Sequence, residues 1–191
     1  MSIVTRRGDT GETSLLFGVR VPKGDLHTEA YGDVDEAISA LGVARAAETD
    51  PDRAAAIIEL QRDLFTVGSE LASTPATRAR MESRYPTVTP GMVERIDAAV
   101  AELEARIPLS RNFIIPGASA RGAALDLART VVRRAERHAA TLHRAGELEN
   151  VEVLRYLNRA SDYLFMLARQ AESGRSTIKE RAWRPAGHDE N

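Results

Sequence analysis

Apolar residues recur every three to four positions along most of the chain, a spacing typical of amphipathic helices. The pattern covers residues 29–47 and 51–71, and three further runs cover about 90–103, 119–145 and 150–172. No alternating strand pattern separates these runs. The sequence therefore predicts five helices.

Capping residues support several of these helix starts. Asp50 and Thr89 each precede a proline, which is the pattern of an N-cap followed by proline at the first helical position. Asn150 is placed to cap the fifth helix. Residues 72–88 carry prolines, serines and threonines, so we expect a connection there.

The helices favour an all-α fold, a five-helix bundle with a four-helix-bundle-like core. Residues 1–25 lack a helical period and are rich in Gly, Thr and Arg, so we expect an extended or looped arm. Periodicity stops again over residues 174–191, which predicts a mobile tail. The domain would thus comprise residues 1–173.

Composition narrows the class of protein. The 191 residues are 43% hydrophobic and 28% charged, which suits one domain with a buried core. No apolar run approaches the roughly 20 residues of a membrane span, and the first residues do not resemble a secretory signal. Cysteine is absent, which excludes disulfides, thiolate catalysis and cysteine-ligated metal centres. These features favour a cytoplasmic protein without a membrane partner.

Positive charge is concentrated in two zones. The formal net charge is −2, yet residues 121–137 carry a net +3 and residues 5–23 a net +2. An acidic molecule is no generic nucleic-acid binder, so we expect no nucleic-acid partner. Two cationic zones on an acidic background indicate a confined anionic ligand.

Three arginines share one face of the fourth predicted helix. At about 100° per residue, Arg129, Arg133 and Arg137 fall in one sector together with Glu136. The opposite sector is apolar and would form the core stripe, with Leu127, Val131, Ala135 and Leu142. Arginine suits planar recognition of phosphate or carboxylate, so this face is a candidate anion site. A solvated face held by local ion pairs is the alternative.

The fifth predicted helix repeats this design. Its polar sector contains Arg155, Asn158, Asp162 and Arg169. The opposite sector contains Val153, Leu157, Ala160 and Leu164. Asn158 is informative because asparagine is a mediocre helix former and therefore tends to have a specific reason to be there.

The arm carries a second set of anion-binding groups. Gly8 and Gly11 lie among hydroxyl and guanidinium donors, and such glycines let backbone N–H groups approach a phosphate. The segment is not a Walker A loop, because no Gly-Lys-Ser/Thr follows. A plain turn remains the alternative, and Lys23 could be either a phosphate ligand or a surface lysine.

The sequence shows no other recognisable arrangement of catalytic or metal-binding residues. The four histidines show no metal-ligand spacing, and no Gly-x-Ser-x-Gly nucleophile motif occurs. Any chemistry should therefore come from the bound ligands themselves.

Six short motifs follow one another along the chain. They are TRRGDTGET at 5–13, VPK at 21–23, EAYGDVDE at 29–36, NFIIPG at 112–117, ARTVVRRAER at 128–137 and LNRASDYLF at 157–165. In this order and spacing they closely resemble the PduO-type ATP:cob(I)alamin adenosyltransferases. The resemblance extends over about residues 3–172.

The resemblance implies a homotrimer with active sites between neighbouring subunits. The family transfers the 5′-deoxyadenosyl group of ATP to the cobalt of reduced cobalamin and releases triphosphate, with Mg²⁺ accompanying ATP. A corrinoid reductase and an adenosylcobalamin-dependent enzyme are the implied further partners.

The resemblance also assigns site residues. The arm would bind ATP through Thr5, Arg6, Arg7, Gly8, Thr13, Ser14 and Lys23. The neighbouring subunit would contribute Arg133, Arg134, Glu136, Arg137 and Asn158. Asp35 and Arg129 would pair across the interface and shape the corrin site, while Phe113 would lie below the corrin and keep the lower cobalt position empty.

Three positions depart from the family pattern. Ala118 stands where a second glycine is common, Arg7 where a small or polar residue is usual, and Gly24 where aspartate is common. None of these removes a charge that the reaction needs, so they bear on kinetics and corrin affinity.

Two other functions fit the same residues. A non-catalytic trimer could bind ATP and corrinoid as a sensor or cofactor carrier. A structural helix bundle could use its arginine faces to bind an acidic protein, although the glycine-bearing arm would then lack a purpose.

Overall fold

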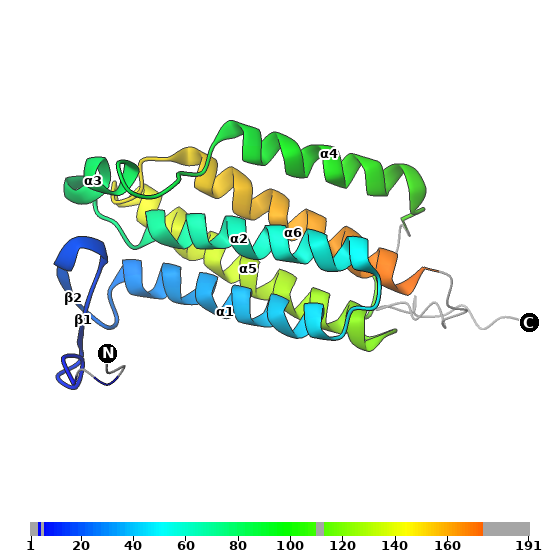
Figure 1. Ribbon diagram of the computed structural model, residues 1–191, viewed down its shortest axis with the longest axis horizontal. Helices are drawn as coiled ribbons and strands as arrows, with labels where there is room; N and C mark the ends of the chain where they lie inside the picture. The colour runs from blue at the N-terminus through cyan, green and yellow to red at the C-terminus, as the bar shows by residue number, and fades with distance from the viewer. Residues whose placement is uncertain (1–3, 5, 110–112, 174–191) are drawn as a thin grey trace, which may run out of the picture.

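Five long helices dominate the computed structural model, which describes residues 4, 6–109 and 113–173 (Figure 1). They are α1 (Leu26–Ala46), α2 (Pro51–Leu71), α4 (Pro90–Arg106), α5 (Ala120–Arg144) and α6 (Val151–Glu172). The predicted all-α fold and all five predicted helices are confirmed, with boundaries that differ by a few residues. The predicted tail, residues 174–191, lies outside the described residues.

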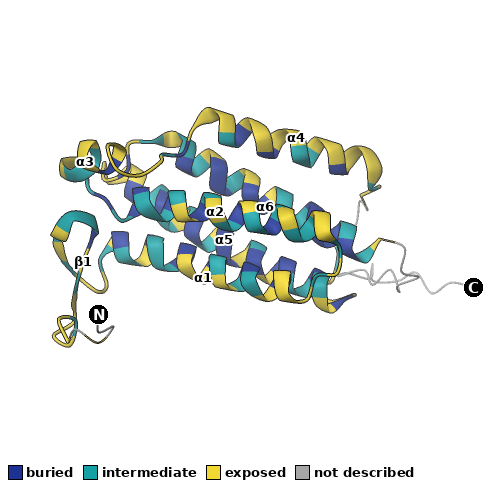
Figure 2. Ribbon diagram, viewed as in Figure 1, coloured by how far each residue is buried: buried dark blue, intermediate teal, exposed yellow. Residues whose placement is uncertain are grey.

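The long helices form a series of packed neighbours: α2 on α1, α1 on α5, α5 on α6 and α6 on α4. The buried side chains lie on the faces that these helices share, and the outward faces are exposed (Figure 2). Leu41, Leu64, Val132 and Leu157 are at most 1% exposed. Burying one such side chain stabilises the fold by roughly 1.5–3 kcal/mol. In the described part of the chain, no helix is long and apolar enough to cross a bilayer.

Side-chain caps fix several helix starts. Asp50 accepts hydrogen bonds from two backbone N–H groups of the first turn of α2, and Asn150 accepts one from α6, as predicted. Asp25 caps α1, which therefore begins three residues before the predicted start. Thr89 occupies the N-cap position of α4, but its side chain makes no capping hydrogen bond.

The connection between α2 and α4 contains structure that the sequence pattern did not predict. It forms the 3₁₀ turn η2 (Pro75–Thr77) and the short helix α3 (Arg78–Glu82). Met81 of α3 is 1% exposed, so the turn is held by burial of this side chain. A five-residue helix is too short to display a period, which explains why it was missed.

One predicted core position is wrong. Leu127 of α5 is 58% exposed, whereas the next residue, Ala128, is fully buried. Successive residues lie about 100° apart around a helix, so a small error in the centre of the buried face moves an edge residue into solvent. The buried face of α5 is centred near Ala128, Val132 and Ala139.

The described part of the predicted extended or looped arm has no helical period, as expected, and it contains a small hairpin. Strand β1 (Glu12–Ser14) pairs antiparallel with β2 (Arg20–Pro22), and the 3₁₀ turn η1 (Leu16–Gly18) lies between them. Leu15 is buried, and the N–H of Leu16 donates to the carbonyl of Ala72 at 2.9 Å. The hairpin is thus anchored at the end of α2, while the rest of the arm projects from the bundle beside the start of α1 (Figure 1).

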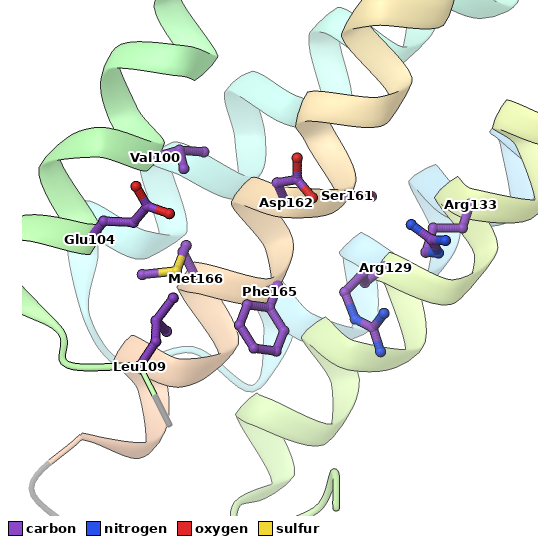
Figure 3. Close-up of a pocket in the computed structure, with 9 residues that line it drawn as sticks. All are labelled: Val100, Glu104, Leu109, Arg129, Arg133, Ser161, Asp162, Phe165 and Met166. Carbon is purple, nitrogen blue, oxygen red and sulfur yellow. The ribbon is translucent and has the colours of Figure 1, made fainter. Parts of the chain in front are cut away.

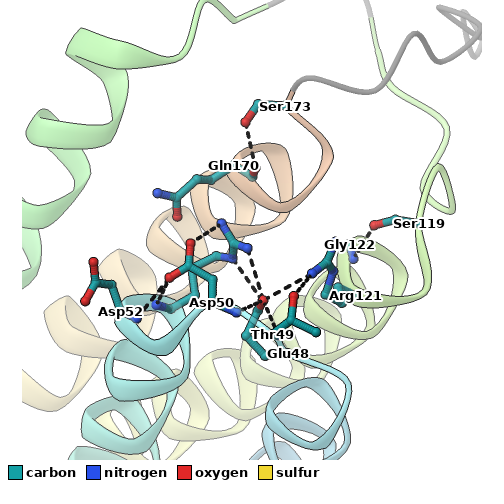
Figure 4. Close-up of polar contacts among 10 residues, drawn as sticks. Glu48, Thr49, Asp50, Asp52, Ser119, Arg121, Gly122, Gln170 and Ser173 are labelled. Atoms are coloured by element: carbon teal, nitrogen blue, oxygen red, sulfur yellow. Dashed lines mark hydrogen bonds and ion pairs between the residues drawn. The ribbon is translucent and has the colours of Figure 1, made fainter.

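A buried carboxylate joins the α1–α2 turn to the start of α5 (Figure 4). The side chain of Glu48 has no exposed surface and accepts two hydrogen bonds from Arg53, at 2.9 and 3.0 Å. Arg121 of α5 lies 3.5 Å from the same carboxylate. Burial acts to raise the pKa of Glu48, but the hydrogen bonds from Arg53 and from the N–H groups of Asp50 and Thr49 outweigh it and lower the pKa to about 2.

We expect Glu48 to contribute to the acid sensitivity of the fold. Its pKa is depressed on folding from 4.5 to about 2, so its contribution is present above pH 4.5 and is lost as the pH falls toward 2. The Glu48→Gln variant should therefore be less stable at pH 7 and should lose less stability between pH 5 and pH 3. Urea unfolding at each pH measures this, with Glu59→Gln, which removes an exposed partner of Arg62, as the control. Equal acid slopes for wild type and Glu48→Gln would contradict it.

Candidate functional site

The arm brings Gly8 and Lys23 together. A Cβ at Gly8 would lie 3.3 Å from Nζ of Lys23, so the ammonium group approaches closely because residue 8 is glycine. The N–H of Lys23 donates to the carbonyl of Gly11 at 2.9 Å, and Gly11 has a φ of +84°, which glycine adopts without strain. The arm therefore places a cation against a glycine turn, an arrangement suited to an anion.

Arg20 fastens this turn to the hairpin, a role that the sequence analysis missed. Its guanidinium donates to Oγ of Ser14 at 3.3 Å, to the carboxylate of Glu12 at 3.0 Å and to the carbonyl of Arg7 at 3.2 Å. Among the other predicted ATP-binding residues of the arm, Arg6, Arg7 and Ser14 are exposed, Thr13 is half-buried, and Thr5 lies outside the described residues.

The structure brings four predicted ATP-binding residues of α5 and α6 to neighbouring positions. Asn158 donates to Glu136 at 3.1 Å and so links the two helices. Arg133 and Arg137 are exposed one turn apart, and Nη1 of Arg137 donates to the carbonyl of Arg133 at 2.9 Å. Neither guanidinium has a carboxylate partner among the described residues, which leaves both free to bind an anionic ligand.

Arg134 differs from its neighbours. It points toward α1, where Nε donates to Asp33 at 2.9 Å and Nη2 contacts Glu36. The hydrogen bond to Asp33 raises the pKa of Arg134. Arg134 therefore joins α5 to α1 in this chain. To bind ATP as well, its guanidinium would have to contact ATP in addition to Asp33 and Glu36.

A pocket of about 300 Å³ opens between α4, α5 and α6 (Figure 3). It is lined by Val100, Glu104, Leu109, Arg129, Arg133, Ser161, Asp162, Phe165 and Met166. One wall thus carries two arginines of α5. The other walls combine apolar side chains with the carboxylates of Glu104 and Asp162 and the hydroxyl of Ser161. Such a cavity suits a ligand with an apolar body and polar groups at its edge.

Glu136 and Asn158 line a second, more open hollow of about 550 Å³ between α4 and α6. Four carboxylates and two arginines surround it: Glu94, Asp97, Glu136, Glu152, Arg155 and Arg159. Three of the predicted ATP-binding residues of α5 and α6 therefore line one of the two hollows: Arg133 the first, and Glu136 and Asn158 the second.

Asp35 and Phe113 are not joined to the rest of the site within one chain. Asp35 is exposed on α1, whereas Nε of Arg129 donates to Asp126 of its own helix at 3.1 Å. Phe113 is 86% exposed in the segment between α4 and α5. The predicted ion pair between Asp35 and Arg129 is absent from the described residues of a single chain.

The arm and the α5–α6 surface are likewise separate. No hydrogen bond or ion pair in the described ranges links Arg6, Arg7 or Lys23 to Arg133 or Arg137. The two predicted halves of the ATP site therefore do not meet within one chain.

Metal-binding side chains are sparse. Residues 4, 6–109 and 113–173 contain no group of three or more His, Asp or Glu side chains placed to hold a metal ion. Mg²⁺ bound with ATP needs few protein ligands, since phosphates and water complete its octahedron. Glu136, which accepts a hydrogen bond from Asn158, is the one carboxylate among the predicted ATP-binding residues and is therefore the candidate ligand.

Behind the pocket lie one residue that the sequence did not single out, Asp126, and one that it placed on the wrong face, Arg169. Asp126 is 3% exposed, and Arg169, which the helical wheel put on the polar face of α6, is 7% exposed. The two form an ion pair of 2.5 Å. An acid three residues before Arg129 was the available signal for Asp126, because residues at that spacing are neighbours on a helix.

The chain is similar to known proteins over nearly its whole length. Residues 3–171 match the model of the family described as cobalamin adenosyltransferase. The chain is 38% identical over 189 residues to a corrinoid adenosyltransferase of Mycobacterium leprae, covering 97% of this chain and 96% of the relative. It is 40% identical over 172 residues to a corrinoid adenosyltransferase of Citrobacter freundii, covering 90% and 95%.

A solved structure shows the same fold. A variant of the PduO-type ATP:corrinoid adenosyltransferase from Lactobacillus reuteri, complexed with cobalamin and ATP, superimposes with a TM-score of 0.82 at 32% identity. The match covers 90% of this chain and 91% of that chain. Because the family model and these relatives span nearly the whole chain, the protein belongs to the cobalamin adenosyltransferase family.

Proposed function

We propose that this protein transfers the 5′-deoxyadenosyl group of ATP to the cobalt of cob(I)alamin, giving adenosylcobalamin and triphosphate. The observation that carries the proposal is the pocket that Arg129 and Arg133 share with Phe165 and Met166. It places Arg133, a predicted ATP-binding residue, beside Arg129, which the corrin site is predicted to use, and beside apolar side chains that can contact a corrin. Family membership supports the same reaction.

The reaction needs no protein base. Co(I) donates an electron pair to C5′ of ATP, so the Co–C bond forms as the C5′–O bond breaks and triphosphate leaves with its electron pair. The protein's part is to hold C5′ over cobalt, which can be worth about 7–11 kcal/mol, and to stabilise the leaving triphosphate. Arg133, Arg137 and Lys23 would neutralise the growing charge. Mg²⁺ bound with ATP would add a Lewis acid, with Glu136 as its candidate ligand.

The site would be completed between subunits of a homotrimer. The arm of one subunit would meet the α5–α6 surface of its neighbour, since the two do not meet within one chain. The same assembly would bring Asp35 of one subunit to Arg129 of the next and leave Phe113 below the corrin. Arg134 would support this surface from behind through Asp33.

Exposed apolar residues on the packed pair α1 and α5 support such an assembly. Val43 and Leu127 are 61% and 58% exposed. We expect Leu127→Glu to weaken the trimer, because a charge buried without a partner is costly. Sedimentation should show the mass falling from three times 20.9 kDa toward that of one chain. Phe65→Glu, at an exposed position on α2, is the control. A Leu127→Glu protein that stays fully trimeric would place the interface elsewhere.

The cellular setting follows from the reaction. We expect the protein to act in the cytoplasm, where a corrinoid reductase supplies Co(I) and an adenosylcobalamin-dependent enzyme takes the product. The absence of cysteine fits a reducing compartment.

Identification of the products tests the proposed reaction. Purified protein with Mg-ATP and chemically reduced cobalamin should release one triphosphate for each adenosylcobalamin formed, as measured by chromatography. Release of diphosphate or monophosphate without adenosylcobalamin would indicate an ATPase. Binding of both ligands without any product would indicate a carrier or sensor.

A further inference from the structure

A charged cluster lies buried behind the pocket, where the start of α5 meets the end of α6. Nη2 of Arg169 lies 2.5 Å from Oδ2 of Asp126 and 3.2 Å from Oε2 of Glu172. Both Asp126 and Arg169 are more than nine-tenths buried. Burying charges costs free energy even when they are paired. A buried ion-pair cluster is therefore weak evidence that its residues serve only to stabilise the fold.

The cluster holds Arg129 from behind. While Oδ2 of Asp126 faces Arg169, Oδ1 accepts a hydrogen bond from Nε of Arg129 at 3.1 Å. The bond at Nε fixes the plane of the Arg129 guanidinium at the edge of the pocket. Its two terminal amino groups have no hydrogen-bond partner among the described residues, so they remain for a group outside this chain.

The same cluster orients an apolar wall of the pocket. The guanidinium carbon of Arg169 lies 5.1 Å from the centroid of the Phe165 ring, within the range of a cation–π contact. Phe165 and Arg129 both line the pocket, from α6 and α5 (Figure 3). Asp126 and Arg169 therefore orient one side chain in each of two walls of the pocket.

The cluster also reaches the segment that carries Phe113. Burial raises the pKa of Glu172, and the backbone of Ala118, which lies five residues after Phe113, acts against this rise. Glu172 packs so closely on α5 that a Cβ at Gly122 would lie 2.3 Å from its Oε1. The glycine thus leaves room for the Glu172 side chain against α5.

We propose that Asp126 and Arg169 are positioning residues for the corrin end of the active site, acting through Arg129 and Phe165. This assignment rests on the proposed function. It predicts that loss of Asp126 impairs use of cobalamin far more than use of ATP, because the arginines predicted to bind ATP, Arg133 and Arg137, lie outside the cluster.

A double-mutant cycle tests the assignment. Kinetics with varied cobalamin and varied ATP are measured for wild type, Asp126→Asn, Arg129→Ala and the double variant. Asparagine keeps the shape of Asp126 but cannot accept from both arginines as a carboxylate does. Asp126→Asn should lower kcat/KM for cobalamin by about 10- to 100-fold, the cost of a small misplacement, with the KM for ATP within about twofold of wild type. In the Arg129→Ala background the same change should cost clearly less than in wild type, because only its effect through Arg169 and Phe165 remains.

Two more variants keep the test decisive. If Asp126→Asn does not fold, Arg169→Lys retains the charge but loses the planar guanidinium over Phe165, and it should show the same selective loss. Asp63→Asn is the matched control. It removes another inward carboxylate with two donors, Tyr156 at 2.8 Å and Arg95 at 2.6 Å, and should lower the melting temperature without changing the KM for cobalamin.

The outcomes separate this inference from the proposed function. If wild type forms no adenosylcobalamin, the proposed function fails first. If wild type is active, additive effects of Asp126→Asn and Arg129→Ala, equal losses toward ATP and cobalamin, or full activity of Arg129→Ala would each overturn the positioning role alone.

Discussion

Replacing Arg133 or Arg137 by alanine is expected to lower kcat/KM for ATP by about 10- to 150-fold. Both guanidiniums are exposed and lack a carboxylate partner in the described part of the chain, so neither change disturbs the fold. A hydrogen bond to a charged group is worth about 1.5–3 kcal/mol, which corresponds to that range. If the contacts strengthen as the triphosphate leaves, kcat should fall along with the rise in KM.

Steady-state kinetics with varied ATP measure this effect. Arg62→Ala is the control, because Arg62 is exposed on α2 and contacts only Glu59 among the described residues. It should retain wild-type kinetics. Unchanged kinetics in both Arg133→Ala and Arg137→Ala would show that triphosphate binds elsewhere.

Replacing Phe113 by alanine should slow adenosylation by at least about tenfold and leave the KM for ATP unchanged. The ring is 86% exposed in the free chain, so its removal costs the core nothing and the melting temperature should not change. If the ring lies below the corrin, burying it there contributes roughly 1.5–3 kcal/mol and excludes the lower cobalt ligand. Without the ring, a lower ligand can bind and Co(II) becomes harder to reduce.

The absorption spectrum of bound cob(II)alamin reports the lower ligand directly. Wild type should show the spectrum of cob(II)alamin without a lower ligand, and Phe113→Ala should show the spectrum with a lower ligand. Phe65→Ala removes a ring that is 62% exposed on α2 and should leave spectrum and rate unchanged. A Phe113→Ala protein with wild-type spectrum and rate would refute the role of Phe113.

Helical periodicity predicted the architecture because each long helix buries one continuous apolar face. The same reasoning placed Glu136 and Asn158 in the polar sectors of two helices, and the structure joins the two side chains by a hydrogen bond of 3.1 Å. Helical periodicity failed where packing against neighbouring elements decides whether a residue is buried. Leu127 lies at the edge of its apolar sector and is exposed, whereas Arg169 lies in a polar sector and is buried because Asp126 neutralises it.

The active site is harder to predict than the fold because its parts come from distant segments. Arg134 adjoins Arg133 in sequence, but one residue of helical rotation turns it toward Asp33 and away from the exposed arginines. Asp35 and Arg129 do not pair within one chain, so only an assembly could bring them together. No periodicity of a single chain contains that information, and the resemblance to a family was needed to suggest it.

The most direct test of the account is an anaerobic assay of chemically reduced cobalamin with Mg-ATP and purified protein. The absorbance of Co(I) should fall and the band of adenosylcobalamin should rise over many turnovers, and Arg133→Ala should slow both changes equally. Persistence of the Co(I) spectrum while both ligands bind by calorimetry would contradict an enzymatic role, and the protein would then be a carrier or sensor built on the same fold.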